Sequence, residues 1–155
     1  LKAISIVVSE YSPDSLWCGY EVGENEQCYF MNEEGLVYGM APYFSGNAFF
    51  RFYGNGVSAD PLGDIFLPKE FEKYSFFAET LSELDVTPVY LAILDEIDFE
   101  VGLDDGSRIL IARDSDLKNV VENLRSVLDS EDFKKEDGID YIDLRFGNKV
   151  YYKLR

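Results

Sequence analysis

Apolar residues recur every three or four positions in two parts of the chain, which predicts two helices. The first runs from about Pro68 to Leu84, with Pro68 in its first turn. Its apolar positions are Phe71, Tyr74, Phe77, Ala78, Leu81 and Leu84. The polar cluster Asp114-Ser115-Asp116 is typical of a helix N-cap and predicts a second helix directly after it. The apolar face of that helix comprises Leu117, Val120, Val121, Leu124 and Leu128.

Short apolar and aromatic runs bounded by turn residues predict strands in the first third of the chain. The β-branched run Ala3–Val8 predicts a strand that ends before Pro13, because proline cannot donate to a sheet. The segments 16–22, 27–31 and 36–38 then predict a β-meander, since polar turn residues separate them at 23–26 and 32–35. From 41 to 64 the chain is rich in Gly, Phe and Tyr, and its pattern does not determine a strand pairing.

More strands are predicted in the second half of the chain. The segment 86–94 favours a strand despite Pro88. The segments 99–103 and 108–111 flank Asp104-Asp105-Gly106-Ser107, which is a good hairpin turn. Together with the helices, these runs predict an α+β fold: a mostly antiparallel β-sheet with two main helices packed on it and a C-terminal β-hairpin at a sheet edge.

The register of the C-terminal hairpin, 139–154, can be predicted from the faces of its side chains. A two-residue loop at Gly147-Asn148 would put lysines on the apolar face of this hairpin, so it is disfavoured. A three-residue loop, 147–149, pairs Phe146 with Val150, Leu144 with Tyr152 and Ile142 with Leu154. It also places Arg145 beside Tyr151 on the opposite face. We therefore predict the three-residue loop.

The composition excludes several classes of function. With 155 residues the chain fits one domain, and 30 acidic against 14 basic residues give a net charge of −16, which repels nucleic acid. The sequence has no histidine, the commonest general base and metal ligand. No run approaches the roughly 20 apolar residues of a membrane span. The spacing of Cys18 and Cys28 suits neither a redox pair nor a zinc site, and it leaves open whether they are free thiols or a disulfide.

Enzymatic and glycan-binding functions have some candidate residues. The carboxylates at 95–98 and at 104–105 are the best candidates for an enzyme, but acidic residues in turns ordinarily cap the backbone or face solvent. We therefore predict no catalytic residues, no metal site and no cofactor. The alternative function is a cell-wall glycan-binding module in which aromatic residues between Tyr38 and Tyr53 stack on sugars, although such residues more often form the core.

Several segments resemble a known family. The strand Tyr141-Ile142-Asp143-Leu144-Arg145-Phe146, followed by a Gly/Asn turn and a basic, aromatic last strand, resembles the end of FtsQ/DivIB-type cell-division proteins. The opening run 6–13 and Trp17 resemble the family's Glu-Arg-x-Pro segment, although Tyr11 stands where the family usually has arginine. The segment 28–37 resembles its strand-turn-strand, and 103–109 lies where the family has a hairpin before its last helix. The match covers most of the chain and is looser from 42 to 64.

This resemblance implies a domain organisation, a function and a location. Residues 1–12 would be the last strand of a truncated POTRA-like domain, and 13–155 the FtsQ/DivIB-like β domain. The protein would be a non-enzymatic scaffold of the bacterial divisome that binds FtsB/DivIC-like and FtsL-like membrane-anchored proteins during septation. It would be a single-pass protein of the cytoplasmic membrane, with one N-terminal span absent from this chain and the present domain on the extracytoplasmic side.

The resemblance also implies a binding site at the last hairpin, where a partner segment adds a strand. The family's binding positions carry over to Arg145 and Phe146. The complete set of candidate partner-binding residues is Tyr141, Arg145, Phe146, Val150, Tyr151 and Tyr152. An unpaired edge strand offers free donors and acceptors to such a partner. Two structural alternatives are that Phe146 belongs to the core and that Arg145 and Tyr151 form an exposed cross-strand pair. The basic residues Lys149, Lys153 and Arg155 either steer an acidic partner or keep the edge soluble.

Overall fold

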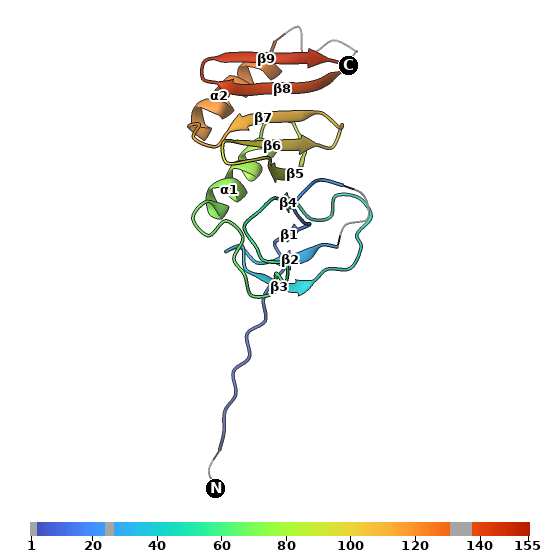
Figure 1. The fold of residues 1–155 in the computed structure, drawn as a ribbon, viewed down its shortest axis with the longest axis vertical. Helices are drawn as coiled ribbons and strands as arrows, with labels where there is room; N and C mark the ends of the chain where they lie inside the picture. Colours follow the sequence, from blue (N-terminus) through green and yellow to red (C-terminus); the bar gives the residue numbers. More distant parts are fainter. Residues whose placement is uncertain (1–2, 24–26, 131–137) are drawn as a thin grey trace.

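The computed structural model describes residues 3–23, 27–130 and 138–155, which form one nine-stranded sheet and two helices (Figure 1). The order of the strands is β3-β2-β1-β4-β5-β6-β7-β8-β9. Most neighbours are antiparallel, so the predicted α+β fold with a C-terminal hairpin at the sheet edge is confirmed. The elements are β1 (Ser15–Trp17), β2 (Tyr29–Met31), β3 (Val37–Met40), β4 (Arg51–Tyr53), α1 (Phe71–Ser82), β5 (Pro88–Ile93), β6 (Asp98–Leu103), β7 (Arg108–Ala112), α2 (Leu117–Leu128), β8 (Ile139–Phe146) and β9 (Lys149–Leu154).

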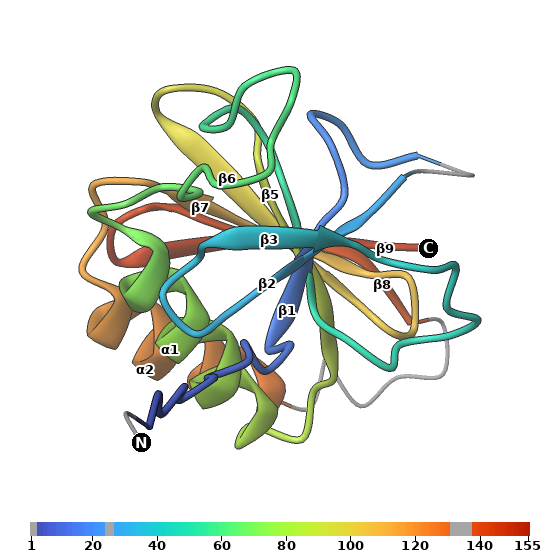
Figure 2. The same ribbon diagram turned by 90° about the horizontal axis from the view of Figure 1, so that it is seen from below.

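Both helices lie on the same face of the sheet, which we call the helix face (Figure 2). They bury their apolar sides there because the inward positions of the strands are also apolar. On α1, the Tyr74 ring lies 4.9 Å from that of Phe99 in β6, and both side chains are fully buried. Helix α1 begins at Phe71 rather than at Pro68, because Leu67 has a φ of 47° and residues 68–70 form a turn.

Helix α2 begins where its predicted cap lies. Asp116 accepts a hydrogen bond from the backbone nitrogen of Lys118 at 3.0 Å, as an N-cap residue should. Val120 and Leu124 are buried on the sheet, while the other members of the predicted face are partly buried against the same core. The sequence prediction for this helix is therefore confirmed.

The N-terminal part of the sheet combines local and distant pairings. Strands β1, β2 and β3 form the predicted antiparallel meander, although the β1–β2 loop is longer than predicted and its residues 24–26 lie outside the described residues. Strand β4 then inserts between β1 and β5 and is parallel to both. Parallel neighbours need a long connection, so their pairing carries no local signal in the sequence. This explains why no pairing could be predicted for 41–64.

The predicted strand Ala3–Val8 is wrong for the described residues 3–8. They form no strand, and Ile4 and Val7 are 88% and 93% exposed. A β-branched run becomes a strand only where a neighbour supplies hydrogen bonds, and no described residue pairs with it. The segment extends away from the sheet in Figure 1. Its assignment to a POTRA-like domain stays a prediction.

The predicted register of the last hairpin is also wrong. Phe146 pairs with Lys149, which leaves the two-residue loop Gly147-Asn148, and Gly147 has a φ of 65°, as such tight turns require. An irregularity between Asp143 and Phe146 then adds a residue on β8, so that Asp143 pairs with Tyr151. This bulge returns the apolar residues to the helix face. The chain therefore keeps both the tight turn and the separation of faces that the prediction treated as incompatible.

Candidate partner-binding edge

The first edge of the sheet, β3, is covered at its start by another part of the chain. The backbone nitrogen of Val37 donates to the oxygen of Asp64 at 2.9 Å, and that of Gly63 donates to the oxygen of Val37 at 2.7 Å. Leu36 forms an isolated bridge with Ile65 in the same segment. Residues 61–66, which we call the β3 cover, therefore occupy the outward hydrogen-bonding groups of Val37 at the start of β3, whereas Met40 at its other end is 65% exposed.

The second edge, β9, ends the sheet. Among the described residues no strand lies beyond it, and five of its six residues are exposed. Tyr151 on the face opposite the helices is 52% exposed, and Leu154 is 37% exposed. Val150 is half-buried and packs against the main core. Strand β9 is therefore paired with β8 on its inner side, and its outer side is available for strand addition by a partner.

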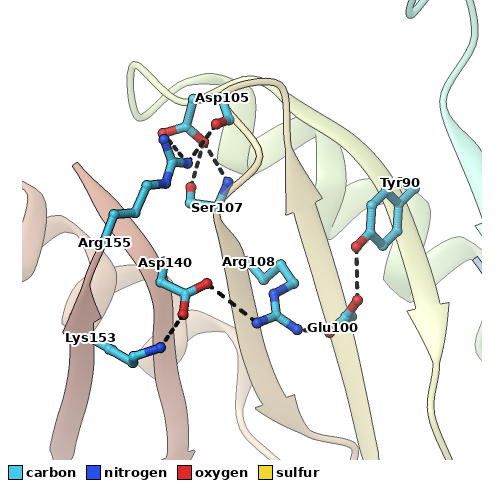
Figure 3. A network of polar contacts seen from close by, with 8 residues as sticks. All are labelled: Tyr90, Glu100, Asp105, Ser107, Arg108, Asp140, Lys153 and Arg155. Atoms are coloured by element: carbon cyan, nitrogen blue, oxygen red, sulfur yellow. Dashed lines mark hydrogen bonds and ion pairs between the residues drawn. The ribbon is translucent and has the colours of Figure 1, made fainter. Parts of the chain in front are cut away.

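A ladder of polar side chains fixes β9 to the sheet across the open face, the face opposite the helices (Figure 3). Lys153 Nζ lies 2.8 Å from Asp140 Oδ2, and this contact lowers the pKa of Asp140 and raises that of Lys153. The ladder continues through Arg108, which lies 3.5 Å from Asp140 and 3.9 Å from Glu100. It ends at Tyr90, whose hydroxyl donates to Glu100 at 2.8 Å. The charges of four strands are thereby connected.

The C-terminal end of β9 has a second attachment. Arg155 Nη2 donates to the backbone oxygen of Asp105 at 2.6 Å, and the Arg155 backbone nitrogen donates to Gly138 at 3.3 Å. Burial tends to raise the pKa of the Asp105 carboxyl, but hydrogen bonds from Ser107 and the charge of Arg155 outweigh it and lower that pKa. Because β9 is already ordered by these contacts, a partner need not supply the free energy of ordering it.

Arg145, the first carried-over binding residue, is bound within its own chain. Its Nε and Nη2 donate to Asp143 at 2.9 and 2.7 Å, and Nη1 donates to Asp98 at 2.6 Å. These bonds lower the pKa of Asp143 and raise that of Arg145. The cross-strand neighbour of Tyr151 is Asp143, so the predicted Arg145–Tyr151 pairing is wrong. Arg145 therefore positions the end of β8 and offers a partner few unused donors.

Phe146, the second carried-over residue, is not part of the core. Its side chain is 55% exposed, whereas Leu144 two positions earlier is 2% exposed, because the bulge separates their directions. Its ring meets that of Tyr151 edge to face at 5.4 Å, and the Arg145 guanidinium lies 5.7 Å from its centroid. An exposed, fixed aromatic pair beside an edge strand is the kind of anchor that dominates interface energetics.

The remaining candidates occupy both faces of the hairpin. Tyr141 is half-buried opposite Lys153 on the open face. Tyr152 pairs with Ile142, which is buried on the helix face, and remains 44% exposed. The structure therefore brings the six candidates together around one hairpin, with Phe146 and Tyr151 as its exposed aromatic pair.

A groove that sequence reasoning missed lies at the Phe146 end of the hairpin; we call it the strand-end groove. It has a volume of about 670 Å³. Its lining residues come from the start of α1, the β5–β6 turn and the ends of β7 and β8: Glu70, Glu96, Ile97, Asp98, Ala112, Arg113, Asp114, Arg145 and Phe146. Ile97 is 69% exposed, but a single exposed apolar residue is common on protein surfaces, so the sequence carries no signal of the groove.

Two of the carboxylates considered for catalysis, Asp95 and Asp105, cap the turns in which they lie. Asp95 Oδ1 accepts hydrogen bonds from the backbone nitrogens of Ile97 and Asp98 at 2.7 and 2.8 Å, which closes the β5–β6 turn. Asp105 does the same for Ser107 in the β6–β7 turn. Within the part of the chain that the structure describes, no group of three or more Cys, Asp or Glu residues is arranged to hold a metal ion. Asp95 and Asp105 therefore stabilise turns.

The two cysteines are joined, which decides the alternative that their spacing left open. Cys18 and Cys28 form a disulfide between the ends of β1 and β2. Cys18 belongs to a second, smaller apolar cluster on the open face, with Leu16, Ala41, Tyr53 and Ala92. Among the aromatics considered for glycan stacking, Phe52 and Tyr53 are buried, and Phe44 and Phe49 are half-buried against this cluster. Tyr43 is the exception at 85% exposure, beside a pocket of about 580 Å³.

No protein-family model matches the chain, and no curated protein matches it. Among residues 3–23, 27–130 and 138–155, no helix is long and apolar enough to cross a membrane.

Proposed function

We propose that this chain is a non-enzymatic scaffold domain of the divisome that binds FtsB/DivIC-like and FtsL-like division proteins. The observation that carries the proposal is the contrast between β3, whose first residue Val37 is bonded to the 61–66 segment, and the ordered β9 edge, beyond which no described strand lies and beside which an exposed aromatic pair stands. A partner segment adds to β9 as a tenth strand through main-chain hydrogen bonds, and contacts with Phe146 and Tyr151 give specificity.

The disulfide supports the proposed location. Disulfides persist in oxidising compartments and are rare in the reducing cytosol. The bond between Cys18 and Cys28 thus agrees with a domain on the extracytoplasmic side of the cytoplasmic membrane. The proposed full-length protein holds the domain there by one N-terminal membrane span, and its membrane-anchored partners share that compartment.

The experiment measures binding to the outer segments of the same organism's FtsB/DivIC-like and FtsL-like proteins. Phe146→Ala is a sharper variant than Arg145→Glu, because a glutamate there would meet Asp98 and Asp143 and disturb the fold as well. For a residue that anchors an interface, the loss is about 2 kcal/mol, roughly 30-fold in affinity. Met40→Ala on β3, where Met40 is 65% exposed, is the matched control and leaves binding unchanged.

Amide hydrogen exchange tests the mode of binding. Strand addition slows exchange of β9 amides in the complex, whereas β3 amides keep their rates. Circular dichroism verifies that all variants are folded. Absence of wild-type binding to both partners, or equal losses in Phe146→Ala and Met40→Ala, would contradict the proposal.

A further inference from the structure

We propose that the strand-end groove binds a lysine or arginine side chain of the partner, in the segment that continues beyond the strand added to β9. This inference rests on the proposed function and specifies the chemistry of the partner at a second contact.

The groove is continuous with the β9 edge. Phe146 lines the groove and also pairs with Lys149, the first residue of β9. A partner strand that runs along β9 past Lys149 therefore arrives at the wall of the groove. Its next residues lie against a hollow surface rather than in open solvent.

The cations in the groove are already neutralised. Arg145 binds Asp98 at 2.6 Å, and Arg113 forms an ion pair with Glu70. Partial burial acts to lower the pKa of Arg113, but the hydrogen bonds that its guanidinium makes with Tyr74 and Glu70 outweigh this and raise that pKa. The Glu70–Arg113 pair connects the start of α1 to the end of β7, and the Asp98–Arg145 pair connects β6 to β8. The two pairs therefore form the fixed walls of the groove.

Two carboxylates remain. Glu96 and Asp114 are exposed and make no ion pair with any residue that the structure describes. The segments that carry them are joined, because the Arg113 backbone nitrogen donates to the oxygen of Ile97 at 2.7 Å. The groove therefore presents a negative pair without a countercharge, which attracts a cation.

The apolar walls select the kind of cation. Ile97 and Phe146 are 69% and 55% exposed and flank the same groove. The aliphatic stem of a lysine or arginine packs on such side chains while its charged end stays at the carboxylates. A free metal ion would gain nothing from those walls, and an acidic or purely apolar segment would leave both carboxylates uncompensated.

The test compares two neutralised variants for binding of the partner's outer segment. Glu96→Gln/Asp114→Asn removes both groove charges. Glu33→Gln/Asp60→Asn removes two exposed charges near the covered edge and changes the net charge equally. We expect the groove variant to lose about five- to ten-fold in affinity at low salt and less at high salt, and the control about two-fold or less.

Exchange of β9 amides separates the failure of this inference from that of the proposed function. If the groove variant binds more weakly while β9 amides remain protected in its complex, the inference holds. If β9 is protected but the groove variant binds as tightly as the control, or more tightly, the groove does not hold a cation and the inference is overturned. A wild-type domain that binds with no β9 protection contradicts the proposed function and this inference with it.

Discussion

The β3 edge and the β9 edge close the same sheet in different ways. At β3 the 61–66 cover supplies backbone hydrogen bonds, and the nearby strands β1 and β2 are joined by a disulfide. At β9 no described strand follows, and the strand is fixed by its pairing with β8 and by side-chain contacts on one face. The cover at Val37 hinders strand addition at the start of β3, which favours β9 as the edge that pairs with a partner and disfavours polymerisation through both edges.

The largest expected effect comes from removing the disulfide near the covered edge. Cys18→Ala/Cys28→Ala removes a crosslink between residues that lie 10 positions apart in the sequence. Such a crosslink contributes about 3 kcal/mol to the free energy of unfolding. Urea unfolding measures this loss. Partner binding at low temperature remains unchanged, because the bond lies among β1 and β2. Equal stability of the variant and the wild type would contradict this prediction, as would loss of binding in a folded variant.

The second effect comes from lifting the β3 cover. Gly35 has a φ of 79°, and a Cβ there would lie 2.8 Å from the Phe71 ring and 3.0 Å from the Phe66 oxygen. We expect Gly35→Ala to cost about 2 kcal/mol or more, from the left-handed backbone and the collision together. The Val37 amide, which donates a hydrogen bond to Asp64 in the cover, should then exchange its hydrogen faster.

Gly46→Ala separates the two contributions to that cost. Gly46 also has a φ of 79°, but nothing lies within 4 Å of its Cβ position. Gly46→Ala should therefore lose only the stability that the left-handed backbone costs, about 1 kcal/mol. If both variants lose the same stability, contact with the cover contributes nothing.

The third effect concerns the β9 side and depends on pH. Asp143 has a lowered pKa because Arg145 donates hydrogen bonds to it, so its ionised form stabilises the folded state above the unfolded pKa of about 3.9. This stabilisation is lost as pH falls through the folded pKa. Asp143→Asn should therefore cost about 1–2 kcal/mol at pH 7 and much less at pH 2 to 3. Thermal unfolding at both pH values measures the difference; a constant penalty would refute it.

The smallest effect is expected from Lys153→Gln. The Lys153 side chain is 62% exposed, and water and salt screen such a pair strongly. We expect no measurable change in Tm, because Arg155 and the β8 pairing still hold β9. A clear fall in Tm would show instead that the polar ladder acts as one unit in fixing the open edge.

The sequence predicted those elements whose signals are local. The cap at Asp116 and the turn 104–107 are read from adjacent residues, and the structure confirms both elements. The position of β4 between β1 and β5 depends on contacts between distant segments, which no local pattern encodes. The strand predicted at Ala3–Val8 fails for a related reason, since strand propensity takes effect only beside a neighbour.

The candidate site was predictable as a hairpin but not in its details. The preference for a two-residue loop and the requirement that apolar side chains share one face predicted different registers. The bulge before Phe146 satisfies both. That bulge turns Phe146 outward and directs Arg145 to Asp143 and Asp98. The strand-end groove was missed because its walls come from four separate parts of the chain.

The placement of β4 also has a consequence for the order in which the protein folds. Hairpins β5–β6 and β6–β7 join strands that are neighbours in sequence, whereas β4 must be held between two parallel partners. Closing long loops costs entropy before any contact forms, so local hairpins have the kinetic advantage. We expect β5, β6 and β7 to pair early in refolding, and β4 to pair with β1 and β5 late. Pulse-labelled hydrogen exchange would show early protection at Val101 and late protection at Phe52; the reverse order would exclude this sequence of events.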